Sequence, residues 1–316
     1  MTEAPSETEQ GSSRFRQIFK GLVVALVVSM TSGCAYNWYA TRAMNREAVR
    51  LPRDQATNVV KGTEAVTLPG KGPNAVLLVH GFVGSRIDFN DLGEVLNNQG
   101  LTVRLMRLPG HGTYPADYAA TSNEELIEAV RNEYRELKKR HEKVALVGFS
   151  MGGALSAVVS SEEKIDRTVL ISPYFGVTHR WYYGLPAETW NGMVSWAIPN
   201  VVKSRRFICV NNEEAKDELY CYTVVPTKCA AKLIRLGKRA RDPSTLTRVS
   251  CPVLVLQSHG DQAASPGRTE KAFPHIGSQD KRIVWYEESN HHILWDFDKE
   301  AAKAEIVEFL GQLIEG

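Results

Sequence analysis

The chain has 316 residues, of which 43% are hydrophobic and 23% charged, a composition typical of a globular protein and too apolar for a disordered one. Its 38 basic and 36 acidic side chains leave a net charge of +2, so we expect no nucleic-acid partner. Five cysteines without Cys-x-x-Cys or His-x-x-x-His spacing argue against a disulfide-dense scaffold and a zinc site, and we expect no metal or other cofactor.

The first 33 residues have the layout of a secretory signal peptide. Arg14, Arg16 and Lys20 precede a short apolar run at residues 22–28, and small residues follow it. Because that run is much shorter than the roughly 20 residues that cross a bilayer, the pattern favours a cleaved signal over a permanent transmembrane helix.

Thr31-Ser32-Gly33-Cys34 ends this segment and resembles the lipobox of bacterial lipoproteins, in which the cysteine is acylated and becomes the new N-terminus. The resemblance implies a lipid anchor on Cys34 that attaches the protein to a membrane. The residue after the cysteine is Ala35 and not Asp, which resembles Gram-negative lipoproteins sorted to the outer membrane. This resemblance implies a bacterial cell-envelope protein that faces the periplasm. Residues 34–60 would then form a tether with one short helix. The alternative is an uncleaved amphipathic N-terminus with a chance cysteine.

Beyond the tether, apolar strands alternate with amphipathic helices. Six strands are expected, at Asn74–His80, Leu101–Leu108, Lys143–Phe149, Thr168–Ser172, Pro252–Gln257 and Arg282–Tyr286. This alternation predicts an α/β fold with a mostly parallel central sheet and helices on both faces. The core would comprise residues 61–173 and 248–316, with an insertion at 174–247. Ligands of such sheets bind beyond the carboxyl ends of the strands.

Gly148-Phe149-Ser150-Met151-Gly152 lies where a predicted strand ends and a predicted helix begins. A tight turn at this point strains the backbone of the central serine, and only small residues two before and two after it avoid collision. The helix N-terminus places free N–H groups beside the hydroxyl. We therefore expect Ser150 to be a nucleophile rather than a structural serine.

A serine hydroxyl needs a base and an orienting carboxylate, which follow the nucleophile in the order acid, then histidine, on this type of scaffold. His291 and His292 follow the last strand, and we favour His291 as the base. Asp261 follows the strand before it and is the expected acid. Asp242 and Asp296 are rival carboxylates. Asp242 comes before that strand, and Asp296 is too close in sequence to His291 to face it easily across the site.

The tetrahedral intermediate of acyl transfer needs N–H donors fixed in advance. The residue after the nucleophile supplies one of them on this turn, which is the N–H of Met151. The turn after the first long strand, His80-Gly81-Phe82, should supply the second, and we favour the N–H of Phe82. His80 is expected to anchor that loop through hydrogen bonds.

Taken together, these motifs resemble α/β-hydrolase-fold serine hydrolases, particularly the monoacylglycerol-lipase-like and small bacterial carboxylesterase groups. The matching landmarks, in chain order, are His80-Gly81-Phe82, Leu108-Pro109-Gly110-His111-Gly112, Gly148-Phe149-Ser150-Met151-Gly152-Gly153, Gly260-Asp261 and Ser289-Asn290-His291. The resemblance covers roughly residues 64–173 and 248–316. It also implies that residues 174–247 form a cap over the active site.

The insertion is rich in aromatic residues: Tyr174, Phe175, Trp181, Tyr182, Tyr183, Trp190 and Trp196. They could line an acyl-chain site or simply dock the insertion on the core. Three of the chain's cysteines also lie there, and Cys221 could pair with Cys209 or with Cys229 in an oxidising compartment. Buried free thiols are the alternative.

These features predict a serine hydrolase that cleaves carboxylic esters through an acyl-enzyme on Ser150. An acyl ester, of short to medium chain or monoacylglycerol-like, is the expected substrate. The same machinery serves thioesterases and amidases, and the scaffold also carries C–C bond hydrolysis and perhydrolysis. A membrane-tethered binding protein with this fold is the non-enzymatic alternative.

Overall fold

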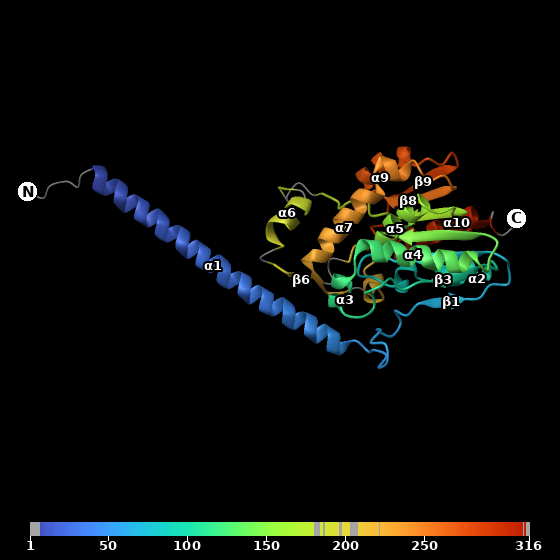
Figure 1. Cartoon of the computed structure of the whole chain (residues 1–316), viewed down its shortest axis with the longest axis horizontal. Coiled ribbons are helices and arrows are strands. Elements are labelled where there is room, and N and C mark those ends of the chain that lie inside the picture. The colour runs from blue at the N-terminus through green and yellow to red at the C-terminus, as the bar shows by residue number, and fades with distance from the viewer. Residues whose placement is uncertain are drawn as a thin grey trace, which may run out of the picture.

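The computed structural model describes residues 7–179, 184–185, 187–195, 198–202, 208–220, 222–311 and 313. Its centre is a seven-stranded sheet with the order β1-β3-β2-β4-β5-β8-β9 (Figure 1). The strands are β1 (Val66–Leu68), β2 (Ala75–Val79), β3 (Thr102–Leu105), β4 (Val144–Phe149), β5 (Arg167–Ile171), β8 (Val253–Ser258) and β9 (Lys281–Tyr286). All neighbouring strands are parallel except β1, which runs antiparallel to β3 at one edge.

The continuous apolar run of β2 reflects burial on both faces of the sheet. Ala75, Leu77 and Val79 pack into one hydrophobic cluster, whereas Val76 and Leu78 pack into another on the opposite face. Successive side chains of a strand point to opposite faces, so a strand covered on both sides needs an apolar residue at every position.

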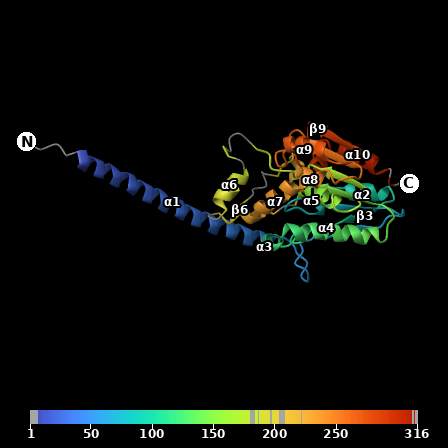
Figure 2. The same ribbon diagram turned by 45° about the horizontal axis from the view of Figure 1, so that its top comes forward.

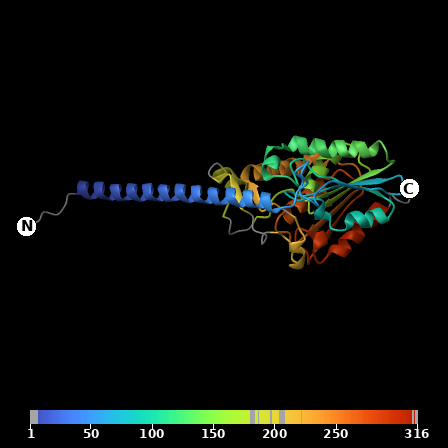
Figure 3. The ribbon, with the colours of Figure 1, turned by 90° about the horizontal axis from the view of Figure 1, so that it is seen from below.

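Helices cover both faces of the sheet, as Figure 3 shows with the sheet seen nearly edge-on. One face carries α4 (Asn123–Lys138) and α5 (Met151–Ser160), together with α7 (Thr227–Ala240), α8 (Pro243–Leu246) and α9 (Pro266–Ala272). The other face carries α2 (Leu92–Asn98) and α10 (Lys299–Gly311). A short helix, α3 (Pro115–Ala120), lies beside α7. The expected α/β fold with a mostly parallel, doubly covered sheet is confirmed, and all six expected strands are present.

The segment between β5 and β8 contains more secondary structure than the sequence pattern revealed. It includes α6 (Ala187–Val194), α7 and an antiparallel two-stranded ribbon of β6 (Asn200–Val202) and β7 (Val224–Pro226). We call residues 174–247 the cap. In Figures 1 and 2, α6 and β6 form the end of the body nearest the N-terminal part of α1, which projects away from it.

The N-terminal part of the chain is more helical than expected. Helix α1 runs unbroken from Glu7 to Arg50, through Cys34, so the short helix expected within residues 34–60 is the continuation of a 44-residue helix. Residues 21–41 carry no charged side chain and would rise roughly 30 Å as a helix, the thickness of a bilayer core. The apolar run at residues 22–28 is therefore only part of a longer uncharged stretch. Arg16–Arg46 is long and apolar enough to span a membrane, a test that signal sequences near an N-terminus also pass.

The residues after α1 pack against the core rather than forming a free tether. Val59 and Val60 are buried, and the N–H of Val60 donates to the carbonyl oxygen of Gly112 at 2.7 Å. Arg53 forms a β-bridge with Val60. In the sequence, the arginines of this region stand out, whereas Val59 and Val60, which hold it against the core, do not.

Candidate active site

Ser150 lies in the sharp turn between β4 and α5, at φ 54° and ψ −114°. Such a positive φ is strained for a residue with a side chain and persists only when the surroundings enforce it. A Cβ on Gly152 would collide with the carbonyl oxygen of Val79, and one on Gly148 would collide with Gly152 and Ser156. These two glycines therefore let the turn close against β2 and hold the Ser150 hydroxyl at the end of the sheet.

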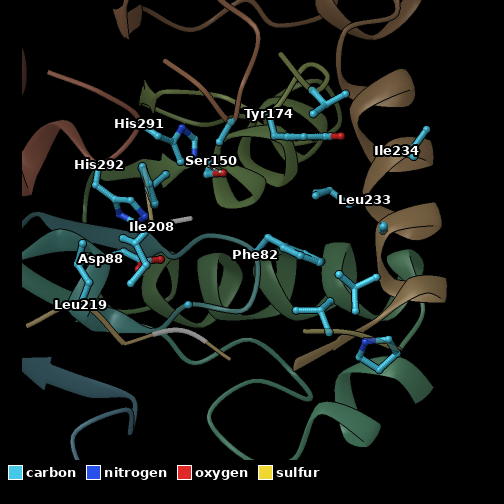
Figure 4. Close-up of a pocket in the computed structure, with 18 of the residues that line it drawn as sticks. Phe82, Asp88, Ser150, Tyr174, Ile208, Leu219, Leu233, Ile234, His291 and His292 are labelled. Carbon is cyan, nitrogen blue, oxygen red and sulfur yellow. Dashed lines mark hydrogen bonds between the residues drawn. The ribbon is translucent and has the colours of Figure 1, made fainter. Parts of the chain in front are cut away.

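The structure brings the three sequence-predicted side chains into one hydrogen-bonded row. His291 Nε2 lies 2.9 Å from Ser150 Oγ, and His291 Nδ1 lies 2.8 Å from Asp261 Oδ2. All three residues are buried. In Figure 4, Ser150 and His291 point toward one another at the cavity. The row has the order that proton transfer from an alcohol to an imidazole, oriented by a carboxylate, requires.

Four hydrogen bonds hold the Asp261 carboxylate. Its Oδ1 accepts from the backbone N–H groups of Ala263 and Ala264, both at 2.8 Å. Its Oδ2 accepts from Gln257 Nε2 at 3.0 Å as well as from His291. Gln257 is held in turn by the hydroxyl of Thr269, which donates to its Oε1 at 2.9 Å. A carboxylate that accepts this many hydrogen bonds has a fixed orientation.

The rival carboxylates have other partners. Asp296 is buried and accepts backbone N–H bonds from Asn211, Asn212 and Asn290, so it fastens part of the cap to the loop that carries His291. Asp242 caps the N-terminus of α8.

The second histidine, His292, lies beside this hydrogen-bonded row. The centre of its ring lies 4.9 Å from that of the Phe149 ring, and its backbone N–H donates to the carbonyl oxygen of Cys209. It also lines the cavity (Figure 4), whereas Ser150 Oγ faces His291.

Sequence reasoning missed the polar groups that support the row. The side chain of Asn290 accepts from the backbone N–H groups of His291 and Gln262. It therefore ties the loop that carries His291 to the loop that follows Asp261. Gln257 is the other such group. Gln257 comes shortly before the landmark Gly260-Asp261, and Asn290 lies within Ser289-Asn290-His291. In the sequence, however, a side-chain amide at a strand end or in a loop looks like any other polar residue.

The loop after β2 is held by two buried side chains. Asp88 Oδ2 accepts from the N–H of Gly81 at 2.8 Å. His80 Nδ1 lies 3.0 Å from the carbonyl oxygen of Gly81, and its Nε2 accepts from the N–H of Leu108 at 3.0 Å. These bonds require neutral imidazole, and burial lowers the pKa of His80 to about 4. His80 therefore anchors the loop, as expected. Phe82 follows Gly81 and lines the cavity with Ser150, while Met151 begins α5.

An apolar cavity of about 480 Å³ leads to Ser150 and His291. Cap helix α7 contributes Leu233 and Ile234 to one side, and Ile208 and Leu219 lie on another (Figure 4). Tyr174 and Trp190 also line it, and Tyr174 packs in the core cluster as well, so both of the roles considered for the aromatics of the insertion occur. Phe175, in contrast, is buried in the core. The remaining aromatics, Trp181, Tyr182, Tyr183 and Trp196, lie outside the described residues.

No group of three or more metal-ligating side chains occurs among the residues the structure describes. Cys229 and Cys251 are buried free thiols, and burial raises the pKa of Cys229 to about 11. Both expected disulfide pairs involve Cys221, which lies outside the described residues.

Comparison with known proteins agrees with this architecture. The family described as serine aminopeptidase, S33, matches residues 71–299. The thermostable monoacylglycerol lipase of Bacillus sp. (strain H-257) is 30% identical over 241 residues, covering 76% of this chain and 92% of that protein. The carboxylesterase of Bacillus subtilis (strain 168) is 27% identical over 243 residues, covering 77% and 94%. A solved structure from a study of two metagenome-derived lipolytic enzymes superposes with a TM-score of 0.72 at 28% identity, covering 80% of this chain and 99% of that one.

The fold and these relatives define a serine hydrolase with the α/β-hydrolase fold. Within that class, the chain belongs to the serine aminopeptidase S33 family, whose match spans most of its length. The expected resemblance to monoacylglycerol-lipase-like enzymes and bacterial carboxylesterases is confirmed, as is the expectation of an ester-hydrolysing enzyme.

Proposed function

We propose that the protein hydrolyses carboxylic esters through an acyl-enzyme on Ser150, with His291 as general base and acid and Asp261 as its orienting carboxylate. The observation that carries this proposal is the continuous row of hydrogen bonds, 2.9 Å and 2.8 Å long, at the apolar cavity. A non-catalytic binding protein would have no need for a strained serine aligned with a base and a buried acid.

In the first half-reaction, Ser150 Oγ attacks the ester carbonyl carbon while His291 Nε2 takes the hydroxyl proton. Asp261 accepts the Nδ1–H bond and stabilises the imidazolium. The N–H groups of Phe82 and Met151 donate to the oxyanion, each contributing about 3–4 kcal/mol to lowering the barrier. The carbon–oxygen bond to the alcohol then breaks, and the alcohol leaves with the proton from Nε2. The acyl group remains on Ser150.

In the second half-reaction, His291 Nε2 takes a proton from water as its oxygen attacks the acyl carbon. The same two N–H groups donate to the new oxyanion. The bond to Ser150 Oγ breaks as Nε2 returns a proton to it, which releases a carboxylic acid and restores the enzyme.

The cavity favours a substrate with an apolar acyl chain. Its lining is mainly aliphatic and aromatic, so each 100 Å² of acyl surface buried there contributes roughly 2.5 kcal/mol. Monoacylglycerols and medium-chain esters fit this description. The monoacylglycerol lipase relative supports the same substrate class.

The test is a chain-length series of p-nitrophenyl esters and 1-monoacylglycerols on the full chain in detergent. We expect activity to peak at an intermediate or long acyl chain, and Ser150→Ala to lower kcat by at least about 10⁴-fold without changing the unfolding midpoint. A fluorophosphonate probe should label Ser150 in the parent and not in the variant. An active Ser150→Ala protein, or a folded parent that neither turns over nor takes the label, contradicts the proposal.

We further propose that the N-terminal segment attaches the protein to a membrane of the bacterial cell envelope, through acylation of Cys34 as an outer-membrane lipoprotein facing the periplasm. The exposed Cys34 thiol and the apolar residues before it support this attachment. Expression with an alkyne fatty acid should label the parent and not Cys34→Ser, and cleavage should make Cys34 the first residue. A full-length, unlabelled membrane protein would instead identify α1 as a retained membrane span.

A further inference from the structure

The continuation of α1 beyond Cys34 is docked on the cap. Tyr36 Oη accepts a hydrogen bond from the N–H of Val202 in β6 at 3.1 Å. Ala40, one helical turn further on, is completely buried, and Met44 follows after another turn next to Pro226 of β7. Residues four apart lie on one face of a helix, so these three form a stripe that faces the β6–β7 ribbon.

Exposed apolar side chains concentrate on the same part of the cap. Outside α1, the large hydrophobic side chains described as exposed number six, and four of them are Leu185, Trp190, Met193 and Val201. Trp190 and Met193 lie three residues apart on α6, and Trp190 and Val201 also line the cavity that leads to Ser150. In Figures 1, 2 and 3 this region is the end of the body nearest the outlying part of α1. The apolar patch therefore joins the mouth of the cavity.

Either form of attachment would bring this patch close to the lipid headgroups. Acylation of Cys34 would put the acyl chains two residues before Tyr36, which is roughly 3 Å along the helix. A retained span over residues 21–41 would end beside Trp38 and Tyr39, which are 62% and 54% exposed. Aromatic side chains of this kind mark the membrane–water interface. Arg42, whose guanidinium lies 4.4 Å from the Trp38 ring, is then at phosphate level.

We propose that residues 36–44 of α1 act as a strut that fixes the cap against the membrane surface, so that the patch of Leu185, Trp190, Met193 and Val201 enters the interfacial layer. The cavity then receives single-chain acyl esters directly from the bilayer. The occupant of the patch is the lipid surface itself. This inference rests on the proposed ester hydrolysis and assigns its substrate to the membrane phase.

The test compares two substrates of one enzyme reconstituted in phosphatidylcholine vesicles: 1-oleoylglycerol within the bilayer and p-nitrophenyl butyrate in solution. Leu185→Glu and Met193→Glu place charges on the patch at exposed positions that do not line the cavity. We expect each to lower hydrolysis of the bilayer substrate by about tenfold, with hydrolysis of the soluble ester within twofold of the parent. Phe297→Glu, at a 60% exposed position outside the cap, is the matched control and should change neither.

The strut is tested with Ala40→Glu, which places a charge on the buried face of α1, and with Asn45→Glu as an exposed control on the same helix. We expect Ala40→Glu to remain in the vesicle fraction and to lose bilayer-substrate hydrolysis selectively. Unchanged hydrolysis of the bilayer substrate in all three cap and strut variants, or an equal loss on both substrates, overturns the inference. A parent that cleaves neither substrate would instead contradict the proposed function.

Discussion

At the scale of single residues, the site depends on groups that are fixed before substrate arrives. The turn at Ser150 closes because Gly148 and Gly152 lack a Cβ, and this requirement is visible in the sequence. The positions of Ser150, His291 and Asp261 could likewise be chosen from the strand ends that precede them. Gln257 and Asn290 could not, because their importance comes from which groups happen to face them after folding.

His80 should make stability depend on pH. Because burial lowers its folded pKa to about 4 from 6.5, the unfolded chain binds a proton at higher pH than the folded one. Its contribution is fully present above pH 6.5 and is lost as pH falls to 4, amounting to roughly 3 kcal/mol. We expect His80→Gln to be less stable at pH 7.5 and to lose less free energy of unfolding between pH 6.5 and 4.5 than the parent.

Urea unfolding of the parent and His80→Gln across this pH range measures that difference. His275→Gln, at an exposed position, is the control and should follow the parent. His111 is also buried with its pKa lowered by burial, so some acid sensitivity should remain in the variant. Parallel stability–pH curves for the parent and His80→Gln would contradict the assignment of a buried, neutral imidazole.

At the scale of elements, local signals predicted the core well and the cap poorly. A capping box begins α4: the N–H of Glu125 donates to Ser122 Oγ at 3.1 Å, and the Glu125 side chain accepts from the N–H of Ser122. Strands β6 and β7 have three residues each, too few for a two-residue alternation to be recognised. The unbroken α1 was missed because lipobox-like residues at its middle suggested an end, although small and polar residues are tolerated within a helix.

Lys232 adds a polar link between helix α7 and the core, beside the apolar packing of that helix. Lys232 Nζ donates to the carbonyl oxygens of Tyr118, Ala119 and Thr121 at the end of α3, and partial burial lowers its pKa. Carbonyls at the end of a helix have few intrahelical donors, although that of Tyr118 also accepts from the N–H of Thr121 at 3.2 Å. We expect Lys232→Met to reduce the free energy of unfolding by about 1–3 kcal/mol, because three partly buried acceptors lose a charged donor.

Lys228→Met is the matched control, since Lys228 lies one turn earlier on α7 and is exposed. It should change the free energy of unfolding by less than about 0.5 kcal/mol. Equal effects of the two substitutions, measured by urea unfolding at pH 7.5, would show that Lys232 contributes by helix propensity or general charge rather than through the α3 carbonyls.

At the scale of the whole molecule, one sheet supports two separate hydrophobic clusters and one site. The clusters lie on opposite faces, and the carboxyl ends of β4, β8 and β9 lead to the serine, the acid and the base, respectively. The order of strands along the chain could be predicted, because alternating patterns specify a parallel sheet. The edge position of β1 could not, because its three half-exposed residues carry too little apolar signal.

Because the sheet separates the clusters, small cavities on its two faces should act independently on stability. Ile127 of α4 is buried in one cluster and Ile306 of α10 in the other. Each Ile→Val substitution removes one methylene and should cost about 0.5–1.5 kcal/mol. The double variant should lose the sum within about 0.5 kcal/mol, as expected for sites without shared contacts. Fluorescence and circular dichroism should report the same unfolding midpoint within each of the three variants, because the central strands β2, β4, β5 and β8 each contribute side chains to both clusters. A coupling energy above about 1 kcal/mol, or midpoints that separate between the two probes, would mean that the faces of the sheet are not joined in one cooperative unit.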